Sequence, residues 1–567
     1  MRKRKRYILL LTVVGVAAVI FLVGRMRRVT IPPGSHLFLT IGGSYVDAPP
    51  QDWIGRLVGS RRHGLIDLLL TIRKAQADTR VGGLVVRITP LDCGWAKIQD
   101  IRDALAEFRR AGKSLVAVLE YQGGGANREY YLATAAERVN LAPGTTAPLC
   151  GLAAHFTFLG GLWEKIDLDL QVERISEYKT AGDLLTAKKM SAAHREMANA
   201  LLDSLAQQFV GGVATARSIS ADQVRALIDR CPTTPREYQE AALSDGTQDL
   251  ADIIGPLRAA RRLVEADDYA RVSPASVGIG TGPRIAVVMG VGSIVTGESS
   301  TTLQGATVGA DTMRDAIKAA AEASEVRAIV LRVDSPGGSP LASDLIWRAV
   351  ADARRQKPVV VSMSDVAASG GYYLAAAASR IVAQPATYTG SIGAFYARPS
   401  VGRLLARVGI NTETIVRGKL AAMGDLTTPL NAAARARIVT DLEYIYRLFV
   451  SRVAEGRALS PDRVNELGRG RVWTGEQAKA NGLVDELGGF ATAVRAAKVA
   501  AGLDPEQDAQ LVFYPEPEGL LAQLGSVLDA RLTARMPRPL LELLAATPWP
   551  FEAESPLALM PMRYDIR

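Results

Sequence analysis

The chain has 567 residues, which is too long for one ordinary domain and indicates at least two large ones. Its net charge of +9 is typical of proteins that bind nucleic acid, but eight of the basic residues flank one apolar segment near the amino end. Without those eight residues the net charge is only +1. We therefore expect no nucleic-acid partner and attribute the basic character to membrane topology.

That apolar segment, residues 7–24, contains no charged side chain. Its eighteen residues are near the lower limit for crossing a hydrocarbon core of about 30 Å. Five basic residues precede it and three follow, which predicts that residues 1–28 form a cytoplasmic basic end and a single transmembrane anchor. A cleaved signal peptide is the alternative, but no Ala-x-Ala site precedes Arg25. The bulk of the protein would then lie in a periplasm, held in contact with membrane lipid through residues 7–24.

The rest of the chain contains an internal repeat. Over residues 130–151, ten of twenty-two positions are identical to those found 242 residues later. Strand-like and helical runs alternate in both copies, which predicts α/β architecture with crossover connections. We predict copy one at 35–268, a linker rich in Gly, Ser and Pro at 269–284, copy two at 285–504 and a C-terminal tail at 505–567.

Two strand-like runs in copy two end in glycine-rich turns. Residues 328–333 run into Asp334-Ser-Pro-Gly-Gly338, and residues 358–363 lead to Ser369-Gly-Gly371. A helix start is predicted after each turn, so the Ser369 hydroxyl can stand clear of the sheet. Glycines also allow backbone N–H groups to approach a developing negative charge. The pattern predicts a nucleophile beside an oxyanion hole.

Three motifs carry a resemblance to a known family: Ser335-Pro-Gly-Gly338, Ala368-Ser-Gly-Gly-Tyr372 and Thr389-Gly-Ser-Ile-Gly393. They resemble the signal peptide peptidase A (SppA) family of membrane-anchored serine proteases, in its long, duplicated form. The resemblance implies tandem Clp/crotonase-like domains behind one transmembrane helix in the bacterial inner membrane. It also implies an endopeptidase that degrades cleaved signal peptides, without cofactor or metal, as a dome-shaped homotetramer.

A serine nucleophile needs a base, and histidine is the usual one. The four histidines, at positions 36, 63, 155 and 194, all precede Ser369 and all belong to copy one. In the family the base is a lysine within a short motif, which 176–180 matches, so Lys179 is the candidate. Lys188 and Lys189 are alternatives.

The repeat supports Lys179 independently of the family. At the offset of 242, Lys179 corresponds to Ala421 and Ser369 corresponds to Asn127. Each copy thus lacks one member of the pair, and we expect Lys179 of copy one to serve Ser369 of copy two.

The remaining roles follow from the mechanism and the resemblance. A buried lysine can lose its charge and take a proton from serine. Ser391 matches a family serine that orients the lysine, although it also fits an ordinary turn. We expect the oxyanion to be held by backbone N–H groups of Gly370 and of Gly337 or Gly338. At Asp334 the chain departs from the family, which usually has asparagine there.

Two other functions remain open at this point: an acyl-CoA enzyme of the crotonase type, and a catalytically silent scaffold at the membrane. The first needs no serine–lysine pair, and the second is disfavoured by intact catalytic positions. The three cysteines match no metal-binding spacing.

Overall fold

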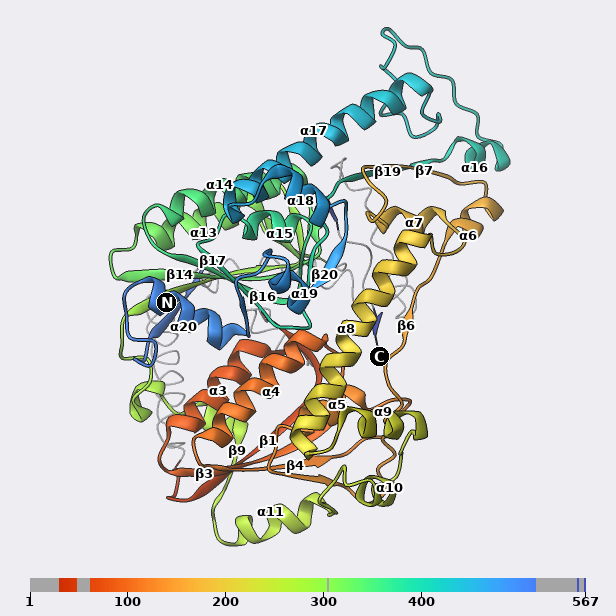
Figure 1. The fold of residues 1–567 in the computed structure, drawn as a ribbon. Coiled ribbons are helices and arrows are strands. Elements are labelled where there is room, and N and C mark those ends of the chain that lie inside the picture. Colours follow the sequence, from red (N-terminus) through yellow and green to blue (C-terminus); the bar gives the residue numbers. More distant parts are fainter. Residues whose placement is uncertain (1–29, 48–61, 303–304, 516–557, 560–564, 567) are drawn as a thin grey trace, which may run out of the picture.

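The computed structural model describes residues 30–47, 62–302, 305–515, 558–559 and 565–566 (Figure 1). The predicted anchor at 7–24 lies outside these residues. Within the described ranges, no helix combines the length and apolar character needed to span a bilayer.

Copy one is a parallel sheet whose strands alternate with helices. Over the described residues its order is β2-β1-β3-β4-β5-β8, with β9 beside β1. The inner strands β3, β4 and β5 are buried along most of their length, as central strands of a parallel sheet are, whereas β1 alternates between buried and partly exposed residues. Its elements are β1 (Ser35–Val46), β2 (Arg62–Gly64), α3 (Leu65–Ala77), β3 (Val81–Leu91), α4 (Trp95–Arg110), β4 (Ser114–Leu119), α5 (Asn127–Ala133), β5 (Arg138–Leu141), β6 (Ala154–His155), α6 (Gly160–Lys165), β7 (Asp169–Arg174), α7 (Ala181–Thr186), α8 (Ala192–Arg217), α9 (Ala221–Arg230), α10 (Pro235–Glu240), β8 (Gly246–Thr247), α11 (Leu250–Ala259), β9 (Leu263–Glu265) and α12 (Ala266–Ala270).

Copy two repeats this plan. Over the described residues its main sheet has the order β20-β18-β16-β14-β10-β22, with β17 beside β16. Its elements are β10 (Arg284–Val291), β11 (Ser293–Val295), β12 (Thr301–Thr302), β13 (Gly305–Gly309), α13 (Ala310–Glu322), β14 (Val326–Ser335), β15 (Gly337–Gly338), α14 (Pro340–Arg354), β16 (Val359–Ala368), α15 (Gly370–Ala375), β17 (Arg380–Ala383), β18 (Tyr388–Gly390), β19 (Phe395–Ser400), α16 (Gly402–Arg407), α17 (Ala432–Arg457), α18 (Pro461–Leu467), β20 (Val472–Thr474), α19 (Gly475–Ala480), β21 (Glu486–Leu487) and α20 (Phe490–Ala500). The C-terminal tail adds β22 (Gln510–Tyr514) to the main sheet and contains β23 (Ala558–Leu559) and β24 (Asp565–Ile566).

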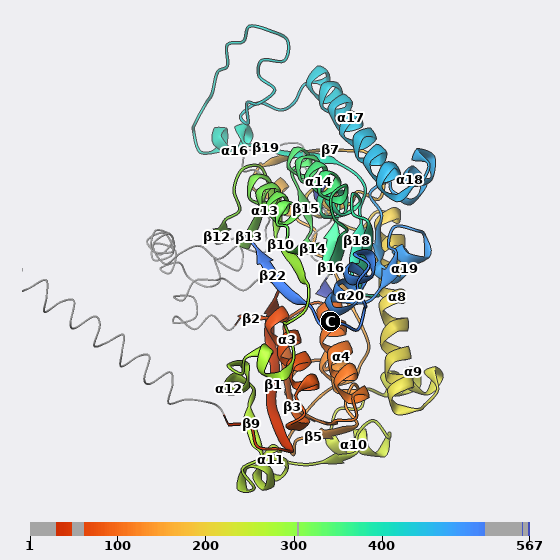
Figure 2. The same ribbon diagram turned by 90° about the vertical axis from the view of Figure 1, so that its left-hand side faces the viewer.

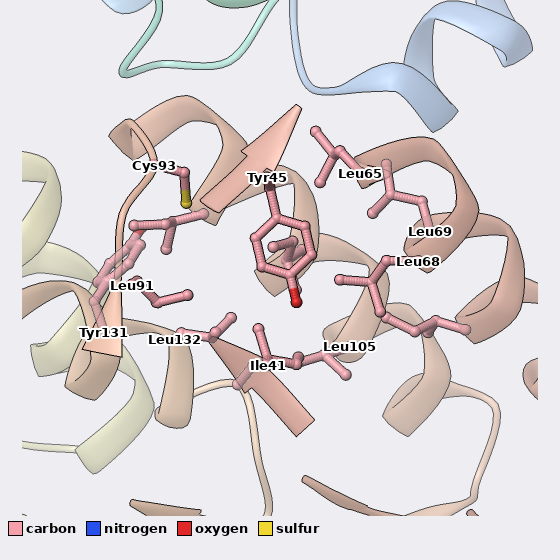
Figure 3. Close-up of a cluster of buried hydrophobic side chains, with 14 of the residues drawn as sticks. Ile41, Tyr45, Leu65, Leu68, Leu69, Leu91, Cys93, Leu105, Tyr131 and Leu132 are labelled. Carbon is pink, nitrogen blue, oxygen red and sulfur yellow. The ribbon is translucent and has the colours of Figure 1, made fainter. Parts of the chain in front are cut away.

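Each copy has a dense apolar core. In copy one, Leu65 and Leu69 of α3 pack with Ile41 and Tyr45 of β1 and with Leu105 of α4 (Figure 3). The long helices α8 and α17 each bury one apolar stripe. The buried residues of these stripes are Met197, Leu201, Leu205 and Phe209 in α8, and Ile438, Leu442, Phe449 and Val453 in α17. Both stripes follow the helical period, as amphipathic core helices do.

The two copies share an extensive contact. In Figures 1 and 2, copy two lies above copy one, and α8 runs along the side of both. Ser204 of α8 is 2.9 Å from the Thr474 hydroxyl, so the helix of one copy is fixed to the strand of the other. A second link is the antiparallel ladder between β7 of copy one and β19 of copy two.

A buried ion network forms the third link. Arg332, in the middle of β14, has a fully buried guanidinium group. It donates to Asp47 and Asp100 of copy one, at 2.7 Å each. Its other bonds go to Ser362, Met363 and Ser364 of β16. All three guanidinium nitrogens therefore have partners, as a buried charge requires.

Candidate active site

Ser369 lies between the end of β16 and the start of α15. Its backbone has φ of +54° and ψ of −116°, a conformation that costs a non-glycine residue roughly 1–3 kcal/mol. The bond from Ser369 N to Gly390 O, at 2.7 Å, helps to hold this turn. The sharp reversal leaves the buried Ser369 side chain at the strand–helix junction.

The glycines beside Ser369 allow two turns to touch. A Cβ atom on residue 370 would lie 3.1 Å from Gly338 N, and one on residue 371 would lie 2.7 Å from Ser335 O. These separations are too short for a larger residue without displacement of backbone. The turn after β14 and the turn after β16 therefore meet beside the serine, as their shared position at the carboxyl ends of neighbouring parallel strands predicts.

Lys179 is the direct partner of the serine. Its Nζ is 2.7 Å from Ser369 Oγ, 3.0 Å from the Ser391 carbonyl oxygen and 3.1 Å from Ser391 Oγ. The side chain is completely buried. Burial holds the pKa of Lys179 well below that of an ordinary lysine. A neutral amine at this position can accept the serine proton.

Copy one delivers this lysine across the interface. After the β7–β19 ladder, Ile175 N donates to Ala394 O at 3.2 Å and Tyr178 N donates to Arg469 O at 3.2 Å. Gly470, with φ of +83°, passes so close that a Cβ atom there would overlap the backbone of Lys179. Lys179 is therefore positioned by backbone contacts with copy two.

The remaining predicted residues lie at the same place. Ser391 is buried with φ of +51°, and its N–H donates to Arg471 O at 2.7 Å. Gly337 N donates to Ser335 Oγ at 3.2 Å. Gly338 N lies close to Gly370, since a Cβ atom on residue 370 would be 3.1 Å from it, so Gly338 is the candidate partner for Gly370 in an oxyanion hole.

The equivalent position in copy one is closed by its own side chains. Asn127, the counterpart of Ser369, donates from Nδ2 to Gly151 O at 2.8 Å and accepts from Gly151 N at 3.2 Å. The buried Glu129 carboxylate accepts a bond from Leu91 N at 2.7 Å, in the turn that corresponds to the Ser335–Gly338 turn. The Glu129 carboxylate thus occupies the Leu91 N–H, in the turn where an oxyanion hole would have to form.

The competing bases lie elsewhere. His194 is buried between Phe156 and Phe158, at ring-centroid distances of 4.9 and 5.9 Å. Lys188 forms a surface ion pair with Glu164 at 2.7 Å, and Lys189 is exposed. His194 is thus a core residue and the two lysines are solvated, and none of the three contacts Ser369.

Sequence reasoning missed the environment of Asp334. Lys97 of copy one donates to Asp334 Oδ2 at 2.6 Å, and Val366 N donates to Oδ1 at 3.1 Å. Asp365 accepts from the backbone N–H groups of Gly94 and Lys97 at the start of α4. Burial raises the pKa of Asp334 to about 6, against the opposing effect of Lys97. The residue before the oxyanion turn is thus anchored to the other copy.

Comparison with known proteins agrees with this geometry. Residues 107–263 and 351–504, together more than half of the chain, match the model of peptidase family S49. The chain belongs to peptidase family S49. It is a serine peptidase of α/β architecture, and one matched segment falls in each copy. The predicted family and enzyme class are confirmed, which disfavours the acyl-CoA enzyme and the silent scaffold.

Two similar proteins match most of the chain. The chloroplastic serine protease SPPA of Arabidopsis thaliana is 35% identical over 465 residues, covering 80% of this chain and 68% of its own length. Protease 4 of Salmonella typhi is 33% identical over 538 residues, covering 89% of this chain and 85% of its own. A solved structure of a ClpP1 mutant from Listeria monocytogenes aligns with 37% of the chain and 94% of its own, at 15% identity and a TM-score of 0.24.

Proposed function

We propose that this S49 peptidase is a membrane-anchored endopeptidase that degrades released signal peptides with a Ser369–Lys179 dyad. The observation that carries the proposal is the 2.7 Å contact between Lys179 Nζ and Ser369 Oγ, with both side chains fully buried. A serine and a lysine with lowered pKa, held at hydrogen-bond distance, form the minimal pair for general-base activation of a hydroxyl.

The chemistry follows the Ser–Lys variant of the serine-protease mechanism. Neutral Lys179 takes the Ser369 proton as Oγ attacks the peptide carbonyl carbon. The backbone N–H groups of Gly338 and Gly370 stabilise the oxyanion, each by roughly 3–4 kcal/mol. The protonated lysine then gives its proton to the leaving amine. Water, deprotonated by the same lysine, releases the acyl group and restores the serine.

Ser391 orients the base in this proposal. Its carbonyl oxygen and its hydroxyl both lie within 3.1 Å of Lys179 Nζ. Two contacts besides the one to Ser369 restrict rotation of the amine and aim its lone pair at the nucleophile. The positive φ of Ser391 allows both groups to face the same atom.

An extended peptide fits beside the serine. The segment Ala558–Leu559 (β23) pairs antiparallel with β15, in the register Gly337↔Leu559 and Gly338↔Ala558. This ladder supports substrate binding by strand addition along β15, with the scissile carbonyl next to the oxyanion donors. Peptide substrates also accord with the family assignment.

The location, substrate and assembly remain parts of the proposal. We propose that residues 7–24 anchor the chain in the lipid of a bacterial inner membrane, with the peptidase on the periplasmic side, and that the chain forms a homotetramer. The charge pattern around 7–24 supports the anchor. A relative from Enterococcus faecium named putative signal peptide peptidase SppA, 34% identical over 176 residues, supports the substrate.

A fluorophosphonate probe tests the dyad directly. The detergent-solubilised full chain should become labelled at Ser369, identified by mass spectrometry of the modified peptide, and the Ser369→Ala protein should not. The Lys179→Met protein should label slowly, whereas Lys188→Met, which removes an exposed lysine, should label at the parent rate. Labelling at another serine, or parent-rate labelling without Lys179, would refute the dyad.

The pH profile tests the protonation state of the base. Since only neutral Lys179 can act, kcat/KM should rise about tenfold per pH unit up to the lowered pKa of this lysine, which lies below the usual value of 10.5, and level off above it. A rate that stays flat from about pH 5 to pH 9 would contradict a lysine base.

Stability should follow the same titration with a definite sign. Between the lowered pKa of folded Lys179 and 10.5, the unfolded lysine binds a proton that the folded one does not. The free energy of unfolding should therefore fall as pH decreases through this window, by up to about 1.4 kcal/mol per unit. The Lys179→Met protein should lack this component in urea titrations.

A further inference from the structure

Residues 411–416 of copy two correspond to β7 of copy one. Unlike β7, they pair with no strand among the described residues. Helices α6 and α16 have the same length at the offset of 242. The bond from Leu159 N to Leu184 O in copy one recurs as Val401 N to Leu426 O in copy two, at 2.8 Å in both. These matching features flank β7 in copy one and residues 411–416 in copy two. The two segments are therefore structurally equivalent.

Copy one likewise carries a counterpart of β19. At the same offset, β5 (Arg138–Leu141) matches β17 (Arg380–Ala383), and β19 corresponds to residues 153–158. Within one chain, the β7 segment of copy one pairs with the β19 segment of copy two. The other two members of the set, 411–416 of copy two and 153–158 of copy one, do not pair with each other among the described strands.

Both segments have the exposure and composition of strands at the edge of a sheet. Every residue of 411–416 is exposed, including 88% of Ile415 and 43% of Val416, whereas its counterpart β7 is half-buried or buried. Threonine, isoleucine and valine make up four of its six residues, a composition that favours strands. Residues 153–158 alternate between exposed and half-buried, which is the period of an edge strand.

The two segments do not meet within one chain. In Figure 1, β7, β19 and α16 form a projecting arm, and α16, which directly precedes 411–416, lies at its tip. Strand β6 lies away from this tip, beside α8. Asp565–Ile566 pairs with Ala154–His155 and covers one edge of β6. A strand has two edges, and no second described strand pairs with β6.

We propose that residues 411–416 of one chain pair antiparallel with residues 153–158 of a second copy of this chain, in the register of the β7–β19 ladder. The observed pair Ala397↔Val172 then becomes His155↔Thr414 between chains. Each chain contributes residues 411–416 to one neighbour and residues 153–158 to the other. The contact is therefore heterologous, and it repeats until a ring closes. This inference rests on the homo-oligomer in the proposed function and is independent of the dyad.

Thiol cross-linking tests this contact in the full-length chain with Cys93, Cys150 and Cys231 replaced by alanine. One preparation carries His155→Cys and the other Thr414→Cys, and a short bismaleimide is added to each alone and to their mixture. Covalent dimers should form only in the mixture, and a chain with both substitutions should give a ladder of multimers. The Val172→Cys, Ala397→Cys chain is the matched control and should cross-link internally.

The outcomes separate this interface from the assembly itself. If the control cross-links and the mixture does not, while sedimentation shows an oligomer, the proposed pairing is overturned and the homo-oligomer stands. A monomer in sedimentation overturns both. Dimers from the Thr414→Cys chain alone would show a twofold contact between arms and would also overturn the pairing.

A charge on the arm provides a second readout. Ile415→Asp should shift the sedimentation profile toward monomer, whereas Val499→Asp, at an exposed apolar residue of α20, should not. Fluorophosphonate labelling of Ser369 should persist in both proteins, because Lys179 and Ser369 meet within one chain. An unchanged mass for Ile415→Asp would contradict the proposal.

Discussion

Replacing Lys179 by methionine should leave a folded protein whose peptide hydrolysis falls by a factor on the order of 10⁴ to 10⁶, close to the loss expected for Ser369→Ala. Methionine fills most of the lysine cavity without a basic nitrogen. The amine is the group in direct contact with Ser369 Oγ, so its removal leaves the serine without a proton acceptor. Initial rates on a fluorogenic peptide measure the loss.

Urea unfolding of the Lys179→Met protein distinguishes loss of catalysis from misfolding. Methionine removes a buried amine that burial already disfavours in its charged form, so the urea midpoint should stay the same or rise. The Ser369→Ala, Lys179→Met double variant should be no slower than either single variant, because the two residues act as one unit. Substantial hydrolysis by Lys179→Met would refute the dyad.

Replacing Arg332 by methionine should destabilise the protein by about 3–5 kcal/mol, the loss expected when one partner of a buried ion pair is removed. The guanidinium is fully buried and is the shared partner of Asp47 and Asp100. Without it, the buried Asp100 loses its guanidinium partner, and Asp47 keeps only its ion pair with Lys97 at 3.5 Å. Urea unfolding followed by circular dichroism measures the change.

Two variants serve as references for Arg332. Arg348→Met removes a side chain that is 60% exposed and pairs with Asp344 four residues away, so it should cost about 1 kcal/mol or less. Adding Asp47→Asn and Asp100→Asn to Arg332→Met should recover part of the lost stability. No destabilisation by Arg332→Met would show that the ion network contributes little to docking of the copies.

The sequence predicted those features that depend on local pattern. Apolar runs ending in glycine turns placed the turns around Ser369 and Gly338 at one edge of a sheet, since parallel strands direct their carboxyl ends the same way. The repeat offset predicted that Lys179 belongs with Ser369, because each copy lacks one of the two. The buried stripes of α8 and α17 follow the helical period, so they too are a local pattern.

Features made by contacts between distant parts of the chain were not predictable. Lys97 meets Asp334 across 237 residues of sequence, and no local pattern links the two. Glu129 looks like a surface residue of a short helix until its bond to Leu91 N is seen. Likewise, Gly470 reads as a loop glycine, and only the approach of the Lys179 backbone explains why a side chain is excluded there.

The proposed base lies in copy one, and its place in the sequence also orders events during synthesis. The ribosome makes the lysine 190 residues before the serine, and the amine reaches the hydroxyl only after copy two has folded and docked. Until then the lysine is solvated and charged, and the serine has no base. With the proposed dyad, a nascent or half-folded chain would therefore be chemically inert toward its own unfolded segments and those of its neighbours, and completion of the fold would switch the peptidase on.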